Sequence, residues 1–151
     1  MAVASLQAIG IAGNMHGATL LDKNGEILHP CILWNDTRSY KQASILDKDV
    51  NLREITGNIV FPGFTAPKLL WIQNNKPELF EQVAKVLLPA SYLGYYLTGE
   101  FFMDMSDAAG TSWLDVGNRC WSEYALKAGN MRSDQMPKLL EGSQVASSVS
   151  K

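Results

Sequence analysis

Short apolar runs, each followed by polar or turn-forming residues, dominate the first third of the chain. Residues 8–12 form one such run and residues 30–34 form another. An uninterrupted apolar run of this length is typical of a strand buried on both faces of a parallel or mixed sheet. Between them, residues 18–21 and 26–28 flank the turn-forming residues 22–25, which predicts a β-hairpin.

Capping residues, prolines and glycines predict helices in the rest of the chain. The predicted helices are residues 38–46 capped by Asp36 or Thr37, a helix capped by Thr65 with Pro67 in its first turn, a helix from Pro77, residues 92–97 between Ser91 and Gly99, and residues 124–128 between Ser122 and Gly129. Residues 86–88 form an apolar strand among these helices, and residues 141–151 form a polar tail that predicts a loop. The alternation of helix and strand favours the α/β class.

Length, composition and charge limit the classes of protein that remain. A chain of 151 residues has the length of one domain, and 46% hydrophobic with 19% charged residues is enough apolar surface for a folded core. A net charge of −2 argues against binding to nucleic acid or to an acidic membrane surface. The two cysteines, Cys31 and Cys120, are too few for a disulfide scaffold, which favours the cytoplasm.

The uncharged stretch over residues 1–21 resembles a targeting or membrane segment only at first sight. It lacks the basic start of a signal peptide, and polar residues such as Asn14 and His16 interrupt its apolar surface. We therefore expect no membrane span.

Two loops that follow the predicted buried strands carry candidate ligand-binding residues. His16 follows the first strand, and Trp34, Asp36 and Arg38 lie at the end of the second. In open α/β sheets, ligands bind beyond the carboxyl ends of the strands. The alternative for His16 is an ordinary hydrogen-bonded or solvated side chain, and for the others a packed indole, a helix cap and a surface ion pair.

A third candidate is the turn-rich stretch that contains Asp104, Asp107 and Asp115. These carboxylates could approach a metal or a phosphate, although capping and loop hydrogen bonds explain them equally well. The sequence contains no Gly-rich phosphate loop, no zinc-binding His/Glu helix and no nucleophile elbow. Spacing and composition alone therefore predict an α/β domain with two loops that could face one ligand.

Four blocks of the sequence together resemble the FGGY carbohydrate kinases. In order along the chain, they are residues 9–17, 30–38, 63–72 and 104–111. Their order and spacing are family-like and cover nearly the whole chain. The third block resembles the N-terminal signature of the family, and Met15-His16-Gly17 resembles the sugar-contacting loop of its bacterial xylulose-kinase branch, which differs in the glycerol kinases.

The resemblance implies an actin-like, ribonuclease-H-like ATPase fold, in which two lobes close over ATP, Mg²⁺ and a sugar. It implies that residues 1–151 form an incomplete N-terminal lobe. The phosphate-binding hairpin would precede this segment, and the catalytic Asp and the C-terminal lobe would follow it. Met15 and His16 are then the first candidates for sugar binding, with Trp34 and Asp36 second. No catalytic residue, metal ligand or ATP contact is assigned within the chain.

The activity implied for the whole enzyme is transfer of the γ-phosphoryl group of ATP to D-xylulose, and the chain alone is expected to be inactive. The whole enzyme could be a cytoplasmic homodimer. Two alternatives stay open: an FGGY kinase for another sugar, polyol or sugar acid, and a non-catalytic sugar-binding or interaction module.

Overall fold

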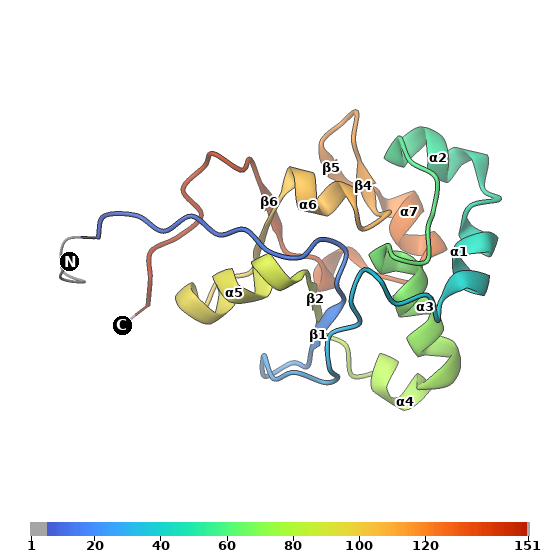
Figure 1. Cartoon of the computed structure of the whole chain (residues 1–151), viewed down its shortest axis with the longest axis horizontal. Coiled ribbons are helices and arrows are strands. Elements are labelled where there is room, and N and C mark those ends of the chain that lie inside the picture. The colour runs from blue at the N-terminus through green and yellow to red at the C-terminus, as the bar shows by residue number, and fades with distance from the viewer. Residues whose placement is uncertain (1–5, 151) are drawn as a thin grey trace.

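The computed structural model describes residues 6–150, and within this range short helices pack around three pairs of short strands (Figure 1). The elements are β1 (Thr19–Leu21), α1 (Tyr40–Leu46), α2 (Val50–Thr56), α3 (Thr65–Asn75), α4 (Pro77–Phe80), β2 (Lys85–Leu87), α5 (Pro89–Thr98), β3 (Phe102–Asp104), α6 (Met105–Ala109), β4 (Leu114–Asp115), β5 (Cys120–Trp121), α7 (Glu123–Ala128), the 3₁₀ helix η2 (Ser133–Gln135) and β6 (Lys138–Leu140).

The strand pairs combine parallel and antiparallel ladders. β1 pairs with β2 antiparallel, with Thr19 opposite Leu87, and β4 pairs with β5 antiparallel. β3 and β6 are parallel, with Phe102 opposite Lys138. Helices separate β1 from β2 and β3 from β6 along the chain, so the fold is mixed α/β as the sequence predicts.

The predicted hairpin after β1 is confirmed. The Asp22 amide donates to the Glu26 carbonyl at 2.9 Å, and the Leu28 amide donates to the Leu20 carbonyl at 2.9 Å. Gly25 has a φ of 82°, a backbone conformation that glycine adopts without steric cost. Turn chemistry therefore fixes this hairpin locally.

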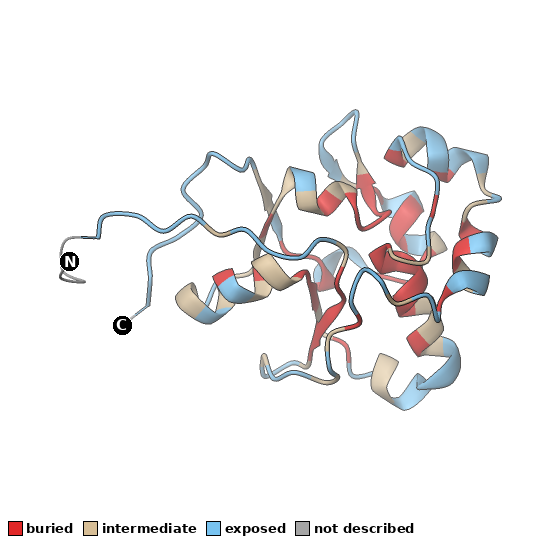
Figure 2. Ribbon diagram, viewed as in Figure 1, coloured by how far each residue is buried: buried red, intermediate tan, exposed pale blue. Residues whose placement is uncertain are grey.

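The main core surrounds α3. Leu69 and Ile72, three residues apart on one face of this helix, are completely buried. They belong to one cluster with Leu20 of β1, Val86 of β2 and Trp113. Figure 2 shows buried residues gathered in the middle of the molecule, on α3, β1 and β2. The core thus holds the start of α3 rigidly in place.

The helices are short and end at defined signals. Gly99 ends α5 with a φ of 76°, as predicted, and Gly57 ends α2, a helix the sequence analysis did not predict. The longest helix, α3, has 11 residues. Within the described range, no helix has both the length and the apolar character needed to cross a membrane.

Some predicted helix starts are shifted. The Ser122 hydroxyl accepts from the Ala125 amide at 3.2 Å and caps α7, as predicted. By contrast, α1 begins at Tyr40 because Asp36 binds the Arg38 amide in a turn before the helix. The predicted caps Thr65 and Ser91 lie inside their helices, α3 and α5.

The two predicted buried strands are wrong. Residues 8–12 are extended but belong to no strand, and Ile9 is 56% exposed. Residues 30–34 form only one bridge, between Ala18 and Ile32, and Leu33 is 43% exposed. An apolar run becomes a buried strand only where neighbouring strands cover it, and among residues 6–150 none pairs with the first run. That run instead crosses the front of the molecule near α5 (Figure 1).

Candidate functional site

The backbone of His16 is held in an uncommon conformation. Its φ is 63°, in the left-handed region that costs a residue with a Cβ atom energy. Its carbonyl oxygen accepts from Lys68 Nζ at 2.8 Å and from Thr65 Oγ1 at 3.2 Å. Both donors lie in the first turn of α3, so the buried start of this helix fixes the loop that carries His16.

The ring of His16 is fixed from the opposite side. Its Nδ1 lies 2.9 Å from the Gly110 carbonyl, which can only accept, so Nδ1 carries the proton. The ring also packs against Phe64, with centroids 4.6 Å apart. Burial lowers the pKa of His16, the hydrogen bond to Gly110 opposes this shift, and the charge of Lys68 lowers the pKa further. The neutral ring therefore leaves Nε2 as a hydrogen-bond acceptor.

Lys68 joins two loops beneath the site. The residue is completely buried, and its ammonium donates to the carbonyls of His16 and Gly63. Burial lowers the pKa of Lys68 to about 8, while electrostatic interactions with Cys31 and Asp36 oppose this shift. A buried ammonium requires hydrogen-bond acceptors, and here backbone carbonyls supply them.

The loop containing Trp34 packs against Gly63, whose carbonyl accepts from Lys68. A Cβ atom on Gly63 would lie 2.5 Å from the Trp34 carbonyl oxygen, so only glycine permits this close approach. The Trp34 and Met15 side chains are 52% and 55% exposed. The two loops predicted from the sequence thus meet at the start of α3, and the Met15 and Trp34 side chains on them are exposed.

Asp36 is engaged by Arg38. Arg38 Nε lies 2.9 Å from both carboxylate oxygens, and Nη2 lies 2.7 Å from Oδ2. Arg38 also stacks over Trp71 with its guanidinium carbon 5.0 Å from the ring centre. The hydrogen bond from Arg38 is the main cause that holds the pKa of Asp36 below its ordinary value. Asp36 and Arg38 thus form the surface ion pair that the sequence analysis gave as the alternative. A sugar hydroxyl would have to share this carboxylate with Arg38.

Sequence reasoning missed Thr65, Lys68 and Gly110 as parts of this site. Thr65 and Lys68 stand three residues apart in the block that resembles the family signature, a spacing that places both on one helix face. That spacing was the available signal. The sequence contains no signal for Gly110, because this residue acts through its carbonyl oxygen and through the space that its missing side chain leaves for the His16 ring.

Two of the three aspartates in the third candidate stretch make local hydrogen bonds to the backbone. Asp104 caps α6 by accepting from the Ser106 and Asp107 amides at 2.9 and 3.1 Å. Asp115 accepts from the Asn118 amide at 2.8 Å. In the part of the chain that the structure describes, no three His, Cys, Asp or Glu side chains gather where they could hold a metal ion. Helix capping explains Asp104, and loop hydrogen bonds explain Asp115.

Asp107 is different, because burial and the nearby charge of Asp104 raise its pKa to about 6. A raised carboxyl pKa means that the folded state binds the proton more tightly, so stability falls as pH rises from about 4 to 6. We expect Asp107→Asn to raise the free energy of unfolding at pH 7.5 by ~1–2 kcal/mol, after allowance for partial exposure. The gain should vanish below about pH 4, where the unfolded-state carboxyl is also protonated.

Thermal melts of wild type and Asp107→Asn from pH 4 to 8 measure this effect. Glu100→Gln, which removes the same charge from an exposed position, is the matched control. A difference in melting temperature between wild type and Asp107→Asn that stays constant across this pH range would contradict the assignment.

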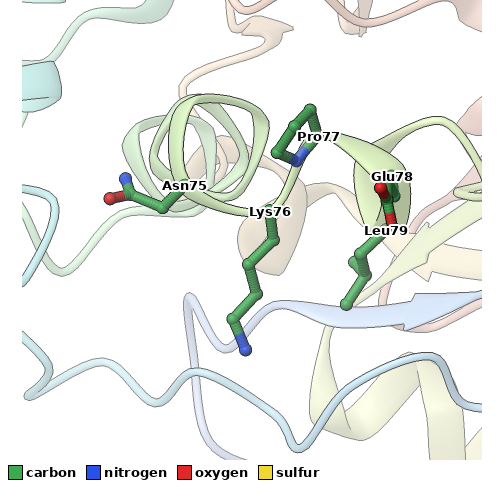
Figure 3. A pocket seen from close by; sticks show the side chains of 5 residues that line it. All are labelled: Asn75, Lys76, Pro77, Glu78 and Leu79. Atoms are coloured by element: carbon green, nitrogen blue, oxygen red, sulfur yellow. The ribbon is translucent and has the colours of Figure 1, made fainter.

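A shallow hollow at the junction of α3 and α4 lies outside this site. It is lined by residues 75–79, and Figure 3 shows the Lys76 side chain extending from it toward the hairpin after β1. There Lys76 Nζ lies 2.9 Å from Nε2 of His29. The hollow shares no residue with the loops at His16 and Trp34, and we assign it no ligand.

Comparison with known proteins identifies the family. The FGGY family of carbohydrate kinases, N-terminal domain, matches residues 2–151. A xylulose kinase from Escherichia coli (strain K12) is 54% identical over 145 residues, which cover 95% of this chain and 30% of that protein. This chain thus spans about 30% of the length of the curated relatives it matches.

Solved structures agree. A crystal structure described as a "xyloylose kinase" from Brucella ovis is 55% identical, with a TM-score of 0.96 over 97% of this chain and 31% of that one. Plasmodium falciparum glycerol kinase with ADP has a TM-score of 0.82 at 24% identity, covering 89% of this chain and 28% of that one, which shows a shared fold alone.

These matches confirm the expected actin-like α/β fold of the N-terminal lobe of the sugar kinases, a family whose members use ATP. The family match covers nearly every residue, including Lys68, which anchors the His16 loop. The chain belongs to the FGGY family of carbohydrate kinases, and it matches their N-terminal domain.

Proposed function

We propose that the whole protein transfers the γ-phosphoryl group of ATP to D-xylulose, giving D-xylulose 5-phosphate, and that this chain positions the sugar. The observation that carries the proposal is the fixed, neutral ring of His16. With Nδ1–H bonded to Gly110, Nε2 is an acceptor for the O–H of a sugar hydroxyl. The xylulose kinases at 54% and 55% identity support D-xylulose as the substrate.

The side chains around His16 suit a sugar. Met15 and Trp34 offer apolar surface to the C–H face of the ligand, while Asp36 is an acceptor already oriented by Arg38. Apolar surface combined with a few fixed polar groups is the usual composition of a small-molecule site. In this proposal, Met15 and His16 make the principal contacts, and Trp34 and Asp36 make secondary ones.

The remaining parts of the reaction are assigned to the rest of the whole enzyme. The phosphate-binding hairpin, the Asp that accepts the hydroxyl proton and the adenine-binding lobe are proposed for segments outside residues 1–151. Mg²⁺ is proposed as the ion that neutralises the phosphates. Among residues 6–150, no three His, Cys, Asp or Glu side chains gather where they could hold this ion. We further propose a cytoplasmic enzyme, which could act as a homodimer.

The test uses a chimera of Escherichia coli xylulose kinase, in which this chain replaces the aligned segment of that enzyme. We expect the chimera to phosphorylate D-xylulose with ATP, and this chain alone, the negative control, to give no turnover. A folded but inactive chimera would favour the alternative of a non-catalytic module. A chimera that prefers another sugar or polyol would contradict the substrate assignment.

In the active chimera, we expect His16→Ala to raise the KM for D-xylulose by roughly 5- to 150-fold, the effect of losing a buried hydrogen bond of ~1–3 kcal/mol. The KM for ATP should change much less. His16→Asn should recover part of the loss because an amide still accepts a hydrogen bond. His29→Ala changes the chain's second histidine and is the matched control. A His16→Ala chimera with a lowered Tm and an unchanged sugar KM would remove His16 from the site.

A further inference from the structure

Lys68 is unusual because its side chain is fully buried and its ammonium donates hydrogen bonds to two backbone carbonyls. Its ammonium donates to His16 O at 2.8 Å, 52 positions away in the sequence, and to the carbonyl of Gly63. Lysine is almost never completely buried unless it is paired. The carbonyls that stabilise this buried charge belong to two loops, so the charge is stabilised only while both loops keep their conformation.

The first of these loops would not keep its conformation through its own residues. His16 occupies the left-handed backbone region, where its Cβ atom crowds the following carbonyl. Such a conformation persists only where the surroundings over-determine it. The donors on the His16 carbonyl are Lys68 and Thr65, of which Lys68 carries the charge and makes the shorter bond.

The orientation of the His16 ring follows from this backbone. The ring reaches the Gly110 carbonyl and packs on Phe64 only while the peptide after His16 keeps its direction. A rotation of that peptide would move the Cβ atom and carry the ring away from Gly110. The tautomer, and with it the acceptor role of Nε2, depends on that contact.

We propose that Lys68 is a positioning residue for the sugar site: it holds the His16 carbonyl, and thereby the His16 ring and tautomer, without contacting the sugar. This inference rests on the proposed function for its kinetic consequence. The coupling between Lys68 and the His16 ring is a property of this chain and can be measured without any turnover.

The first experiment uses the 151-residue chain labelled with ¹⁵N-histidine. In the wild type, we expect the His16 imidazole signals of a ring protonated at Nδ1. Lys68→Met should shift them toward the mixed tautomers of a free imidazole, in a chain whose circular dichroism shows that it is folded. Lys76→Met removes the same charge at the end of the same helix and should leave the His16 signals unchanged. Unchanged His16 signals in folded Lys68→Met would overturn the proposal.

Thr65→Val is the second variant and serves where Lys68→Met does not fold. It removes the weaker donor to the same carbonyl and nearly preserves side-chain volume. We expect a smaller shift of the His16 signals in the same direction. Wild-type signals in this variant, with Lys68→Met unfolded, would count against carbonyl anchoring of the ring.

The second experiment measures kinetics in the chimera. Lys68→Met should raise the KM for D-xylulose by about tenfold or more, with the KM for ATP nearly unchanged, because the loss is one of sugar positioning. Lys68→Arg should restore part of it. In the His16→Ala background, Lys68→Met should add less than about twofold, since the two residues act as one unit. If the increases in KM caused by Lys68→Met and His16→Ala multiply in the double variant, the proposal is overturned. An inactive parent chimera would instead contradict the proposed function and leave the NMR result standing.

Discussion

Trp113→Ala is expected to lower the free energy of unfolding by about 3–5 kcal/mol, the largest effect of any single substitution considered for this chain. Trp113 is 1% exposed and is the largest of the fully buried side chains. Its ring packs against Gly129, where a Cβ atom would lie 2.6 Å from Nε1. Alanine would leave a cavity that this close packing cannot fill. Since domains are stable by about 5–15 kcal/mol, a substantial fraction of the stability would be lost.

Urea denaturation followed by circular dichroism measures this loss. Trp34→Ala removes the same atoms from a side chain that is 52% exposed and should cost less than about 1 kcal/mol. Trp113→Phe should cost less than Trp113→Ala, because the indole Nε1 has no hydrogen-bond partner among the described residues. Equal losses for Trp113→Ala and Trp34→Ala would contradict the position of Trp113 in the core.

Gly110→Ala is expected to have the largest effect on the sugar site. A Cβ atom at this position would lie 2.3 Å from both Cε1 and Nδ1 of His16. The ring must move away, and the hydrogen bond to the Gly110 carbonyl breaks. We expect the KM for D-xylulose in the chimera to rise at least as much as in His16→Ala, roughly 5- to 150-fold, because the displaced ring also occupies space in the site.

The effect on stability should be small, since the displaced imidazole is half-buried and can turn toward solvent. Gly142→Ala is the matched control, because nothing lies within 4 Å of a Cβ atom there. Kinetics of the chimera and ¹⁵N-histidine spectra of this chain measure both consequences. Wild-type His16 signals in Gly110→Ala would show that the ring does not occupy the described place.

The hairpin and α7 were predicted correctly because each has a local cause. The hairpin follows from the turn at residues 22–25, and α7 lies between the Ser122 cap and Gly129. The strands predicted at residues 8–12 and 30–34 failed because burial on two faces depends on neighbours distant in the sequence. The sequence of a short apolar run does not reveal which strands will lie beside it.

Only some residues of the candidate site could be predicted from the sequence. His16 and Trp34 were chosen because they follow apolar runs, and their loops do meet, although the runs are not buried strands. Lys68 and Gly110 could not be assigned from the sequence, because they contact His16 across 52 and 94 positions. The family resemblance marked the segment that contains Lys68 but left its chemistry open.

The anchoring of His16 by its carbonyl bears on how such a site can diversify. Every amino acid has this oxygen, so the bonds from Lys68 and Thr65 do not depend on which side chain occupies position 16. The left-handed backbone admits Asn, Asp or Gly readily and β-branched residues poorly. A gene could therefore exchange the group presented to the ligand by one substitution while the loop keeps its shape. Such a scaffold separates evolution of ligand preference from preservation of the fold.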